Sequence, residues 1–311
     1  MKVGIIGVGT VGAATAMAMV LRARAREIVL VDSNRARAKA VATDMHYGVP
    51  LSPLVTIRDG DYADLAGAGL AIICAGVNEK AGGATDRNDP AGRLRLLEPN
   101  VKVFQDIVPR LMKVAPNAVI LIATNPPEPL VELTRRLAGH DRVLSTSTTL
   151  DSLRFRLHLS GRLAVSPASV EAYVVSEHGT FSVFLWSSAR IGDMPLQELL
   201  KQRGLKLDEF RQSIERDVRY ANITIIEGIG ASQYGIGMVA ARLAEVILRD
   251  ERAIYPVGSH NPRYGVALSL PSVIGKAGVS EVLWPEMSAE EIKGIEASAA
   301  RLKEVVATYV K

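Results

Sequence analysis

Three side chains between residues 151 and 178 have the types that proton transfer beside a bound anion requires. They are Asp151, Arg154 and His178. An imidazole titrates near neutral pH and can give or accept a proton, and a neighbouring carboxylate fixes its tautomer. A guanidinium forms two parallel hydrogen bonds with a carboxylate, so Arg154 is a candidate for holding a small organic acid. These residue types therefore indicate a site for an acidic substrate that gains or loses a proton.

Each of these residues also has an ordinary structural interpretation. His178 alone could be a half-buried histidine, and Asp151 with Arg154 could be a helix-start carboxylate in an i,i+3 ion pair. Which interpretation holds depends on the elements that position the three side chains, and these begin at the N-terminus.

A glycine-rich loop near the N-terminus has the pattern of a dinucleotide-binding site. It reads Gly7-Val8-Gly9-Thr10-Val11-Gly12, follows an apolar run at 3–6 and opens a predicted helix at 11–25. In that context Gly7 permits the tight turn, Gly9 lets the backbone approach a pyrophosphate, and Gly12 lets the helix pack on the strand. We expect the N–H groups at the helix start, at Thr10 and Val11, to bind the phosphates. A glycine-rich turn without a ligand is the alternative.

Asp32 follows the second apolar run, at 28–31, and lies twenty residues after Gly12. A carboxylate at this place accepts hydrogen bonds from the adenosine ribose and repels a 2′-phosphate, which favours NAD over NADP. Arg35 lies close enough in the sequence to keep NADP as an alternative.

Apolar runs alternate with helical patterns through the first 145 residues. Strands are predicted at 3–6, 28–31, 54–57, 70–74, 118–123 and 143–144, and helices at 11–25, 35–46, 93–113 and 127–137. This alternation is typical of an α/β fold with a doubly wound parallel sheet of the Rossmann type.

The pattern changes after about residue 146. Strands are predicted at 170–175 and 182–187, and helices at 207–227, 235–249 and 289–309. We therefore predict a dinucleotide-binding domain at 1–145 and an α+β substrate domain at 146–311. No linker-like or low-complexity stretch separates them, so the two halves should pack tightly.

Composition excludes several classes of protein. A chain of 311 residues with 48% hydrophobic residues can bury a large core. Its net charge of +4 would attract anions such as a dinucleotide or acidic metabolite, but a slightly basic solvated surface is the favoured explanation. No basic run with interleaved aromatic residues suggests nucleic acid.

The chain has a single cysteine, Cys74, inside an apolar run. This excludes a disulfide framework and a cysteine-based zinc site, predicts no metal centre and fits a reducing compartment. Residues 3–21 lack charge and could be read as a signal peptide or membrane span, but their glycines fit the binding loop better. We expect a cytoplasmic protein with no membrane partner.

Together these motifs resemble the L-lactate/malate dehydrogenase family over essentially the whole chain. The matching segments are the glycine loop, 31–32, 75–76, 124–126, 150–155, 177–179 and the helix beginning at Tyr234. The resemblance implies an NAD-dependent oxidoreductase that acts on a 2-hydroxy acid, most closely an L-lactate dehydrogenase. It also implies a homodimer or homotetramer and a small-molecule 2-oxo or 2-hydroxy acid as the partner.

The resemblance also implies a role for each site residue. His178 is the acid/base that exchanges a proton with the substrate oxygen, Asp151 orients it, and Arg154 binds the substrate carboxylate. Asn125 resembles the family's asparagine near the substrate oxygen and the nicotinamide. Ser232 falls at a pocket position where the family often has threonine or alanine.

The segment 77–92 is where the chain departs from this family. The resemblance implies a lid arginine that closes over the substrate, and both Arg87 and Arg93 are candidates. Arg93 is favoured because its interval to Asn100 matches the family, whereas Arg87 follows a sequence that superficially resembles the usual Thr-Arg. With Arg93 in this role, the loop before it is longer than is usual, and its glycines and proline suit a hinged lid.

Glu79 bears on which 2-hydroxy acid is used. Malate enzymes of the family usually have an arginine near this position, and lactate enzymes usually have glutamine. A carboxylate here would repel a second substrate carboxylate, which argues against malate unless Arg87 or Lys80 offsets it. The long lid also resembles that of hydroxyisocaproate dehydrogenases, so a branched-chain 2-oxo acid is an alternative to pyruvate.

Two functions of other classes also fit the glycine loop. An NAD-dependent glycosidase would use a metal held by cysteine and histidine, but Cys74 lies in a predicted strand, away from a second ligand. A non-catalytic NAD-binding regulator would not need the combination of Asp151, Arg154 and His178.

Overall fold

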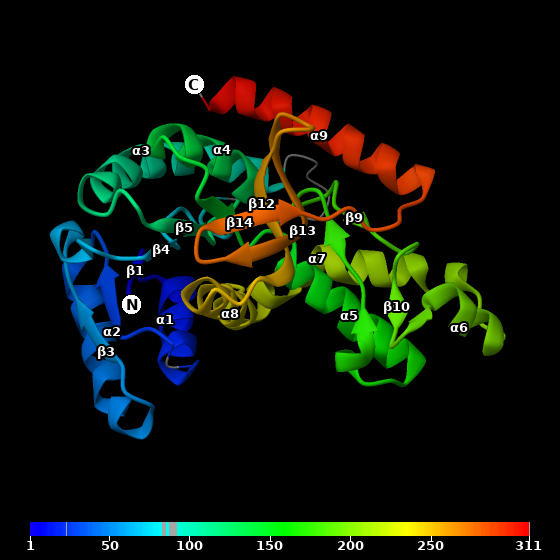
Figure 1. Cartoon of the computed structure of the whole chain (residues 1–311), viewed down its shortest axis with the longest axis horizontal. Coiled ribbons are helices and arrows are strands. Elements are labelled where there is room, and N and C mark those ends of the chain that lie inside the picture. Colours follow the sequence, from blue (N-terminus) through cyan, green and yellow to red (C-terminus); the bar gives the residue numbers. More distant parts are fainter. Residues whose placement is uncertain (23, 83–84, 87–91, 311) are drawn as a thin grey trace.

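The structure is a computed structural model that describes residues 1–22, 24–82, 85–86 and 92–310 (Figure 1). Within these residues a nine-stranded sheet has the order β14-β13-β12-β6-β5-β4-β1-β2-β3. Its parallel part consists of β1 (Lys2–Ile6), β2 (Glu27–Val31), β3 (Thr56–Asp59), β4 (Leu70–Ile73), β5 (Val119–Ile122) and β6 (Val143–Ser145). The order β3-β2-β1-β4-β5-β6 confirms the predicted Rossmann-type sheet.

Helices on both faces connect these parallel strands. They are α1 (Thr10–Arg22), α2 (Arg35–Gly48), α3 (Leu97–Val114) and α4 (Pro127–Ala138), with short 3-10 helices η1 (Val49–Leu51), η2 (Tyr62–Leu65) and η3 (Gly92–Leu96). Every residue of β4 and β5 is buried, as expected for strands covered on both faces. The predicted strands and helices of this half are confirmed with small shifts at their ends, and the helix predicted at 93–113 begins as η3.

Three antiparallel strands extend the same sheet beyond β6. They are β12 (Ala253–Asn261), β13 (Val266–Gly275) and β14 (Gly278–Val282), and none of them was predicted. Nine of the ten β13 residues are buried, because α4 and further helices of the C-terminal half cover the sheet there. The alternation of polar and apolar residues that identifies an exposed antiparallel strand is therefore missing. The sheet continues past residue 145, and the division into domains at that residue stays a prediction.

The rest of the C-terminal half is built from helices and very short strands. The helices are α5 (Thr149–Leu163), α6 (Leu196–Gln202), α7 (Arg211–Ile229), α8 (Tyr234–Arg249) and α9 (Ala289–Tyr309), with η4 (Pro167–Ser169) and η5 (Leu207–Glu209). The strands are β7 (Val170–Glu171), β8 (Val174–Val175), β9 (Val183–Phe184), β10 (Arg190–Ile191) and β11 (Met194–Pro195). The single strand predicted at 170–175 is wrong, since β7 and β8 belong to different sheets. The predicted long helices are confirmed as α7, α8 and α9.

Helix α8 of the C-terminal half packs directly along α1 of the N-terminal half (Figure 1). A Cβ atom at Gly237 would lie 2.8 Å from the backbone carbon of Ala14, so a larger residue would push the helices apart. This close approach brings the start of α8 up to the glycine loop.

The uncharged N-terminal segment forms a strand and a helix rather than one continuous helix. β1 lies inside the sheet between β2 and β4, and α1 has thirteen residues. Within the part of the chain that the structure describes, none of the helices combines the length and the apolar character needed to span a membrane.

Candidate active site

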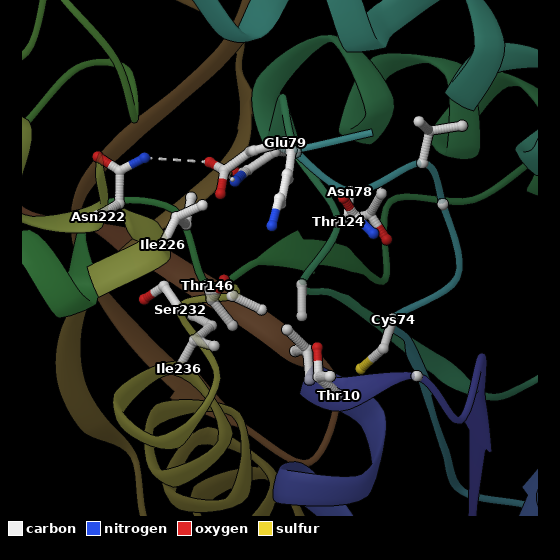
Figure 2. A pocket seen from close by; sticks show the side chains of 18 of the residues that line it. Thr10, Cys74, Asn78, Glu79, Thr124, Thr146, Asn222, Ile226, Ser232 and Ile236 are labelled. Atoms are coloured by element: carbon white, nitrogen blue, oxygen red, sulfur yellow. Dashed lines mark hydrogen bonds between the residues drawn. The ribbon is translucent and has the colours of Figure 1, made fainter. Parts of the chain in front are cut away.

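A cavity of about 660 Å³ lies at the carboxyl ends of β1, β4, β5 and β6. Figure 2 shows the side chains that project into it from separate segments: Thr10 from the glycine loop, Asn78 and Glu79 after β4, Thr124 after β5, Thr146 after β6, Asn222 and Ile226 from α7, Ser232 just before α8, and Ile236 from α8 itself. In doubly wound sheets, ligands bind at the carboxyl ends of the strands where the strand order reverses. Here that place is between β1 and β4.

The glycine loop has the geometry that its sequence predicts. Gly7 has a φ of 91°, and a Cβ there would lie 2.3 Å from the Ala75 backbone nitrogen. A Cβ at Gly12 would lie 1.9 Å from the Gly7 carbonyl oxygen, so both positions require glycine. At Gly9 the Cβ position has no heavy atom within 4 Å, which leaves open space in front of the start of α1. Val8 to Val11 line the cavity, and the loop therefore fits a pyrophosphate at the helix N-terminus.

Asp32 connects the glycine loop to the end of β2. Its Oδ2 accepts a hydrogen bond from the Val8 N–H at 2.6 Å, and its Oδ1 accepts one from the Asn34 N–H at 2.8 Å. Arg35 turns away from it, because its guanidinium donates to the Gly60 carbonyl at 2.8 Å and pairs with Asp61. Sequence analysis did not identify Arg37, which lines the cavity. Its spacing from Asp32 gave no motif by which to find it.

Asp151, Arg154 and His178 meet at the cavity as the sequence predicts. The His178 Nδ1 lies 2.5 Å from Asp151 Oδ2, and the Arg154 Nη1 donates to Asp151 Oδ1 at 2.9 Å. The three side chains are only 9 to 13% exposed. Since one carboxylate holds both neighbours, Nδ1 of the imidazole is occupied, and Nε2 is the nitrogen that can exchange a proton. Arg154 and His178 both line the cavity.

Two asparagines hold Glu79 at the opposite wall. The Asn125 Nδ2 donates to Glu79 Oε1 at 3.1 Å, and the Asn222 Nδ2 donates to the same oxygen at 3.3 Å (Figure 2). Asn222 was missed in sequence analysis, although an asparagine only 6% exposed inside a helix is a signal once the burial is known. The carboxylate of Glu79 is thereby fixed beside Asn125 at the cavity wall.

Asn100 joins the two strand ends that carry Asn125 and Glu79. Its Nδ2 donates to the Asn125 carbonyl at 2.7 Å, and its Oδ1 accepts from the Val77 N–H at 2.7 Å. The side chain is completely buried. In the sequence, Asn100 entered only as the end of the interval counted from Arg93. That interval did not predict that its side chain would be buried.

The remaining predicted positions differ in how far the structure describes them. Ser232 lines the cavity next to the apolar side chains of Ile226 and Ile236 (Figure 2). Arg87 lies outside the described residues, and so does the side chain of Arg93, whose backbone belongs to η3.

Cys74 and the acidic residues bear on a metal-dependent alternative. Desolvation at the cavity wall raises the pKa of the Cys74 thiol to about 12, so it is protonated at neutral pH and a poor metal ligand. Over the described ranges, no group of three histidine, cysteine, aspartate or glutamate side chains is placed to hold a metal ion.

A buried carboxyl group lies behind His178. Glu128, in the first turn of α4, is 2% exposed, and burial raises its pKa to about 8. Its Oε1 accepts hydrogen bonds from the Ser147 hydroxyl and, at 3.3 Å, from the His178 backbone N–H. Glu128 is therefore neutral at pH 7.

We expect this group to make the protein less stable as the pH rises. Its pKa is about 8 in the folded protein against 4.5 as a model value, so the folded state binds the proton more tightly. The resulting stabilisation is complete below pH 4.5, falls between that pH and about 8, and is constant above. Between about pH 5.5 and about pH 8, the free energy of unfolding should fall in wild type by about 3 kcal/mol more than it falls in Glu128→Gln. Urea titrations measure this difference. The exposed Glu296→Gln on α9 is the control, and parallel pH curves for wild type and Glu128→Gln would contradict the expectation.

Comparison with known proteins bears on the whole chain. A family model described as the lactate/malate dehydrogenase NAD-binding domain matches residues 1–144, and one described as the lactate/malate dehydrogenase alpha/beta C-terminal domain matches 148–311. The L-lactate dehydrogenase of Chloroherpeton thalassium is 45% identical over 98% of this chain and 99% of its own. That of Thermus aquaticus is 44% identical over 97% of each chain. The crystal structure of the minor L-lactate dehydrogenase of Enterococcus mundtii, in a ligands-bound form, is similar with a TM-score of 0.91 and 32% identity, covering 99% of this chain and 98% of that one.

Proposed function

Because this chain belongs to the lactate/malate dehydrogenase family and is an NAD-dependent oxidoreductase acting on a 2-hydroxy acid, we propose that it interconverts pyruvate and L-lactate. The observation that carries the proposal is the contact of one carboxylate, Asp151, with both His178 and Arg154 at the cavity wall. A proton donor and a carboxylate receptor held side by side match the two ends of a 2-oxo acid.

Each residue has a definite part in the proposed reaction. The Arg154 guanidinium binds the substrate carboxylate and brings the C2 carbonyl next to the Nε2 of His178. NADH, when bound at the glycine loop, supplies the hydride that reduces C2. His178 gives its proton to the carbonyl oxygen, and takes it back when the hydroxy acid is oxidised. Asp151 stabilises the protonated imidazole and holds its tautomer. Asn125, whose amide donates to Glu79 when no substrate is bound, lines the same cavity and is the proposed donor to the substrate oxygen.

A panel of 2-oxo acids tests the proposed substrate. NADH oxidation is followed by absorbance with pyruvate, oxaloacetate and 2-oxoisocaproate, and kcat/KM should be highest for pyruvate. The apolar side chains of Ile226, Ile236 and Leu96 on the cavity wall keep the branched-chain acid as a second candidate. A higher kcat/KM for 2-oxoisocaproate or oxaloacetate would replace the assignment to lactate, and no turnover with any 2-oxo acid would overturn the function itself.

We expect Glu79 to discriminate against a second substrate carboxylate. Glu79→Gln keeps an oxygen that accepts from Asn125 and Asn222 but removes the negative charge. The ratio of kcat/KM for oxaloacetate to that for pyruvate should rise about fivefold, because a like charge nearby costs on the order of 1 kcal/mol. Glu98→Gln on the exposed face of α3 serves as the control. An unchanged ratio in Glu79→Gln would remove Glu79 from the specificity of the site.

We expect Asp32 to set the preference for NADH. Wild type should use NADH with a kcat/KM at least about 100-fold above that for NADPH, because the carboxylate accepts from the ribose and repels a 2′-phosphate. Asp32→Asn keeps an acceptor for the Val8 N–H and should reduce this preference about tenfold. Steady-state kinetics with both cofactors give the ratio, and Asp44→Asn on the exposed face of α2 is the matched control. Equal preferences in Asp32→Asn and wild type would contradict this role.

The proposal extends to assembly and location. Four large apolar side chains on the adjacent helices α1 and α8, namely Met17, Leu21, Tyr234 and Met238, are 45 to 67% exposed. We propose that a homodimer or homotetramer covers them, and light scattering of the purified protein tests this assembly. A cytoplasmic location is part of the same proposal, supported by a chain whose single cysteine forms no disulfide.

A further inference from the structure

The buried carboxyl of Glu128 joins the segments that carry the proposed catalytic side chains. It lies three residues after Asn125, at the start of α4. One of its oxygens accepts from Ser147, in the turn that leads into α5 and Asp151, and from the backbone N–H of His178. Glu128 thus contacts both segments behind the hydrogen bond between His178 and Asp151.

Both of these segments have backbone conformations that need support. Ser147 has a φ of 36° and Ser176 a φ of 81°, in the left-handed region that non-glycine residues rarely adopt. Such conformations persist when neighbouring groups hold them in place. Ser176 is held by two backbone hydrogen bonds to Ser269 of β13, and two residues later the N–H of His178 is held by Glu128.

We propose that Glu128 is a positioning residue for the reaction. Through its hydrogen bonds with the His178 backbone and with Ser147, it fixes the position and orientation of the His178 ring relative to Asp151. This inference rests on the proposed oxidoreductase function. It concerns a residue that does not line the cavity and acts on the reaction through the positions of His178 and Ser147.

The neutral carboxyl suits this position. Desolvation by burial raises the pKa of the Glu128 carboxyl and outweighs the two hydrogen bonds that Oε1 accepts, which lower it. Glu177 on the same loop as His178 disfavours a further negative charge there. The other titratable groups nearby are Asp151 and His178 themselves and, one turn along α4, Glu132 with its partner His260 on β12. A neutral Glu128 leaves Asp151 as the carboxylate bonded to the imidazole.

Three variants separate positioning from charge. Glu128→Gln keeps an oxygen acceptor for Ser147 and His178, so its kcat/KM for pyruvate at pH 7 should stay within about twofold of wild type. Glu128→Ala removes the acceptor, and a displacement of His178 by a fraction of an ångström should lower kcat about 100-fold. Glu132→Ala is the matched control, since Glu132 is equally buried on the same helix but pairs with His260, and it should keep kcat within about threefold.

A pH profile distinguishes this role from a general loss of structure. If Glu128→Ala loosens the hydrogen bond between His178 and Asp151, the pH above which kcat/KM for pyruvate falls should move about one unit lower, because a carboxylate partner favours the charged imidazole. NADH affinity, measured by fluorescence, should stay within about twofold. Ser147→Ala, which removes only one of the two donors, should give a smaller shift in the same direction and keeps the test open if Glu128→Ala does not fold.

The outcomes bear separately on the two proposals. Wild type without turnover on any 2-oxo acid would overturn the proposed function. Active wild type together with a folded Glu128→Ala of near-normal kcat and an unshifted pH profile would overturn only the positioning role. The positioning role would also be overturned if kcat fell as much in Glu128→Gln as in Glu128→Ala. The same holds if kcat fell as much in Glu132→Ala as in Glu128→Ala.

Discussion

In the His178→Asn enzyme, kcat for pyruvate reduction should fall about 10³- to 10⁴-fold, while NADH affinity stays within about twofold. Asparagine can accept or donate a hydrogen bond at a similar place but cannot carry the proton between solvent and the substrate oxygen. A positioned acid/base contributes rate factors of about 10² to 10⁴, and the asparagine supplies none of this, while Asp151 keeps its ion pair with Arg154. Single-turnover measurements with saturating NADH would separate this chemical step from binding.

His158→Asn is the matched control for this variant. His158 lies on α5, the helix that also carries Asp151, and it does not line the cavity. Its replacement should leave kcat within about twofold of wild type. If His178→Asn retained a tenth or more of the wild-type kcat, the proton would have to come from another group, and the assignment of His178 would be wrong.

The second large effect is expected at Arg154. Arg154→Lys should lower kcat/KM for pyruvate about 10²- to 10³-fold, with a clear rise in KM. Lysine keeps the positive charge but cannot form two parallel hydrogen bonds with the substrate carboxylate, and it cannot reach Asp151 with the same geometry. Steady-state kinetics over a wide range of pyruvate concentrations give both constants.

Arg156→Lys provides the comparison within the same helix. Arg156 donates to the Ala172 carbonyl at 3.1 Å and lies over the Tyr173 ring, away from the cavity. It should change kcat/KM less than about threefold. Equal losses in the two variants would mean that Arg154 acts through the stability of α5 rather than through the substrate.

The parts of the site that were predictable from sequence are those set by local backbone geometry or by short spacing. Gly7 is required by its φ of 91° and Gly12 by its close approach to the Gly7 carbonyl, both inside the strand–turn–helix unit, so a six-residue pattern was enough to identify them. Asp151 and Arg154 lie one helical turn apart, and their contact follows from that spacing.

Other parts depend on contacts between distant segments and could not be read from local patterns. Asn222 reaches Glu79 across 143 positions of sequence, and Glu128 reaches the His178 backbone across 50. Neither contact leaves a periodic signal. The strand β13 was missed for a related reason, since burial on both faces removes the alternation by which such strands are recognised.

The close contact of α8 with α1 makes the shape of the cavity depend on a single glycine outside it. Gly237 lets α8 lie against the helix whose first turn faces the glycine loop, and Ile236 of α8 forms part of the cavity wall. A side chain at position 237 would push α8 away from α1, and the cavity wall at Ile236 would move away from the glycine loop with it.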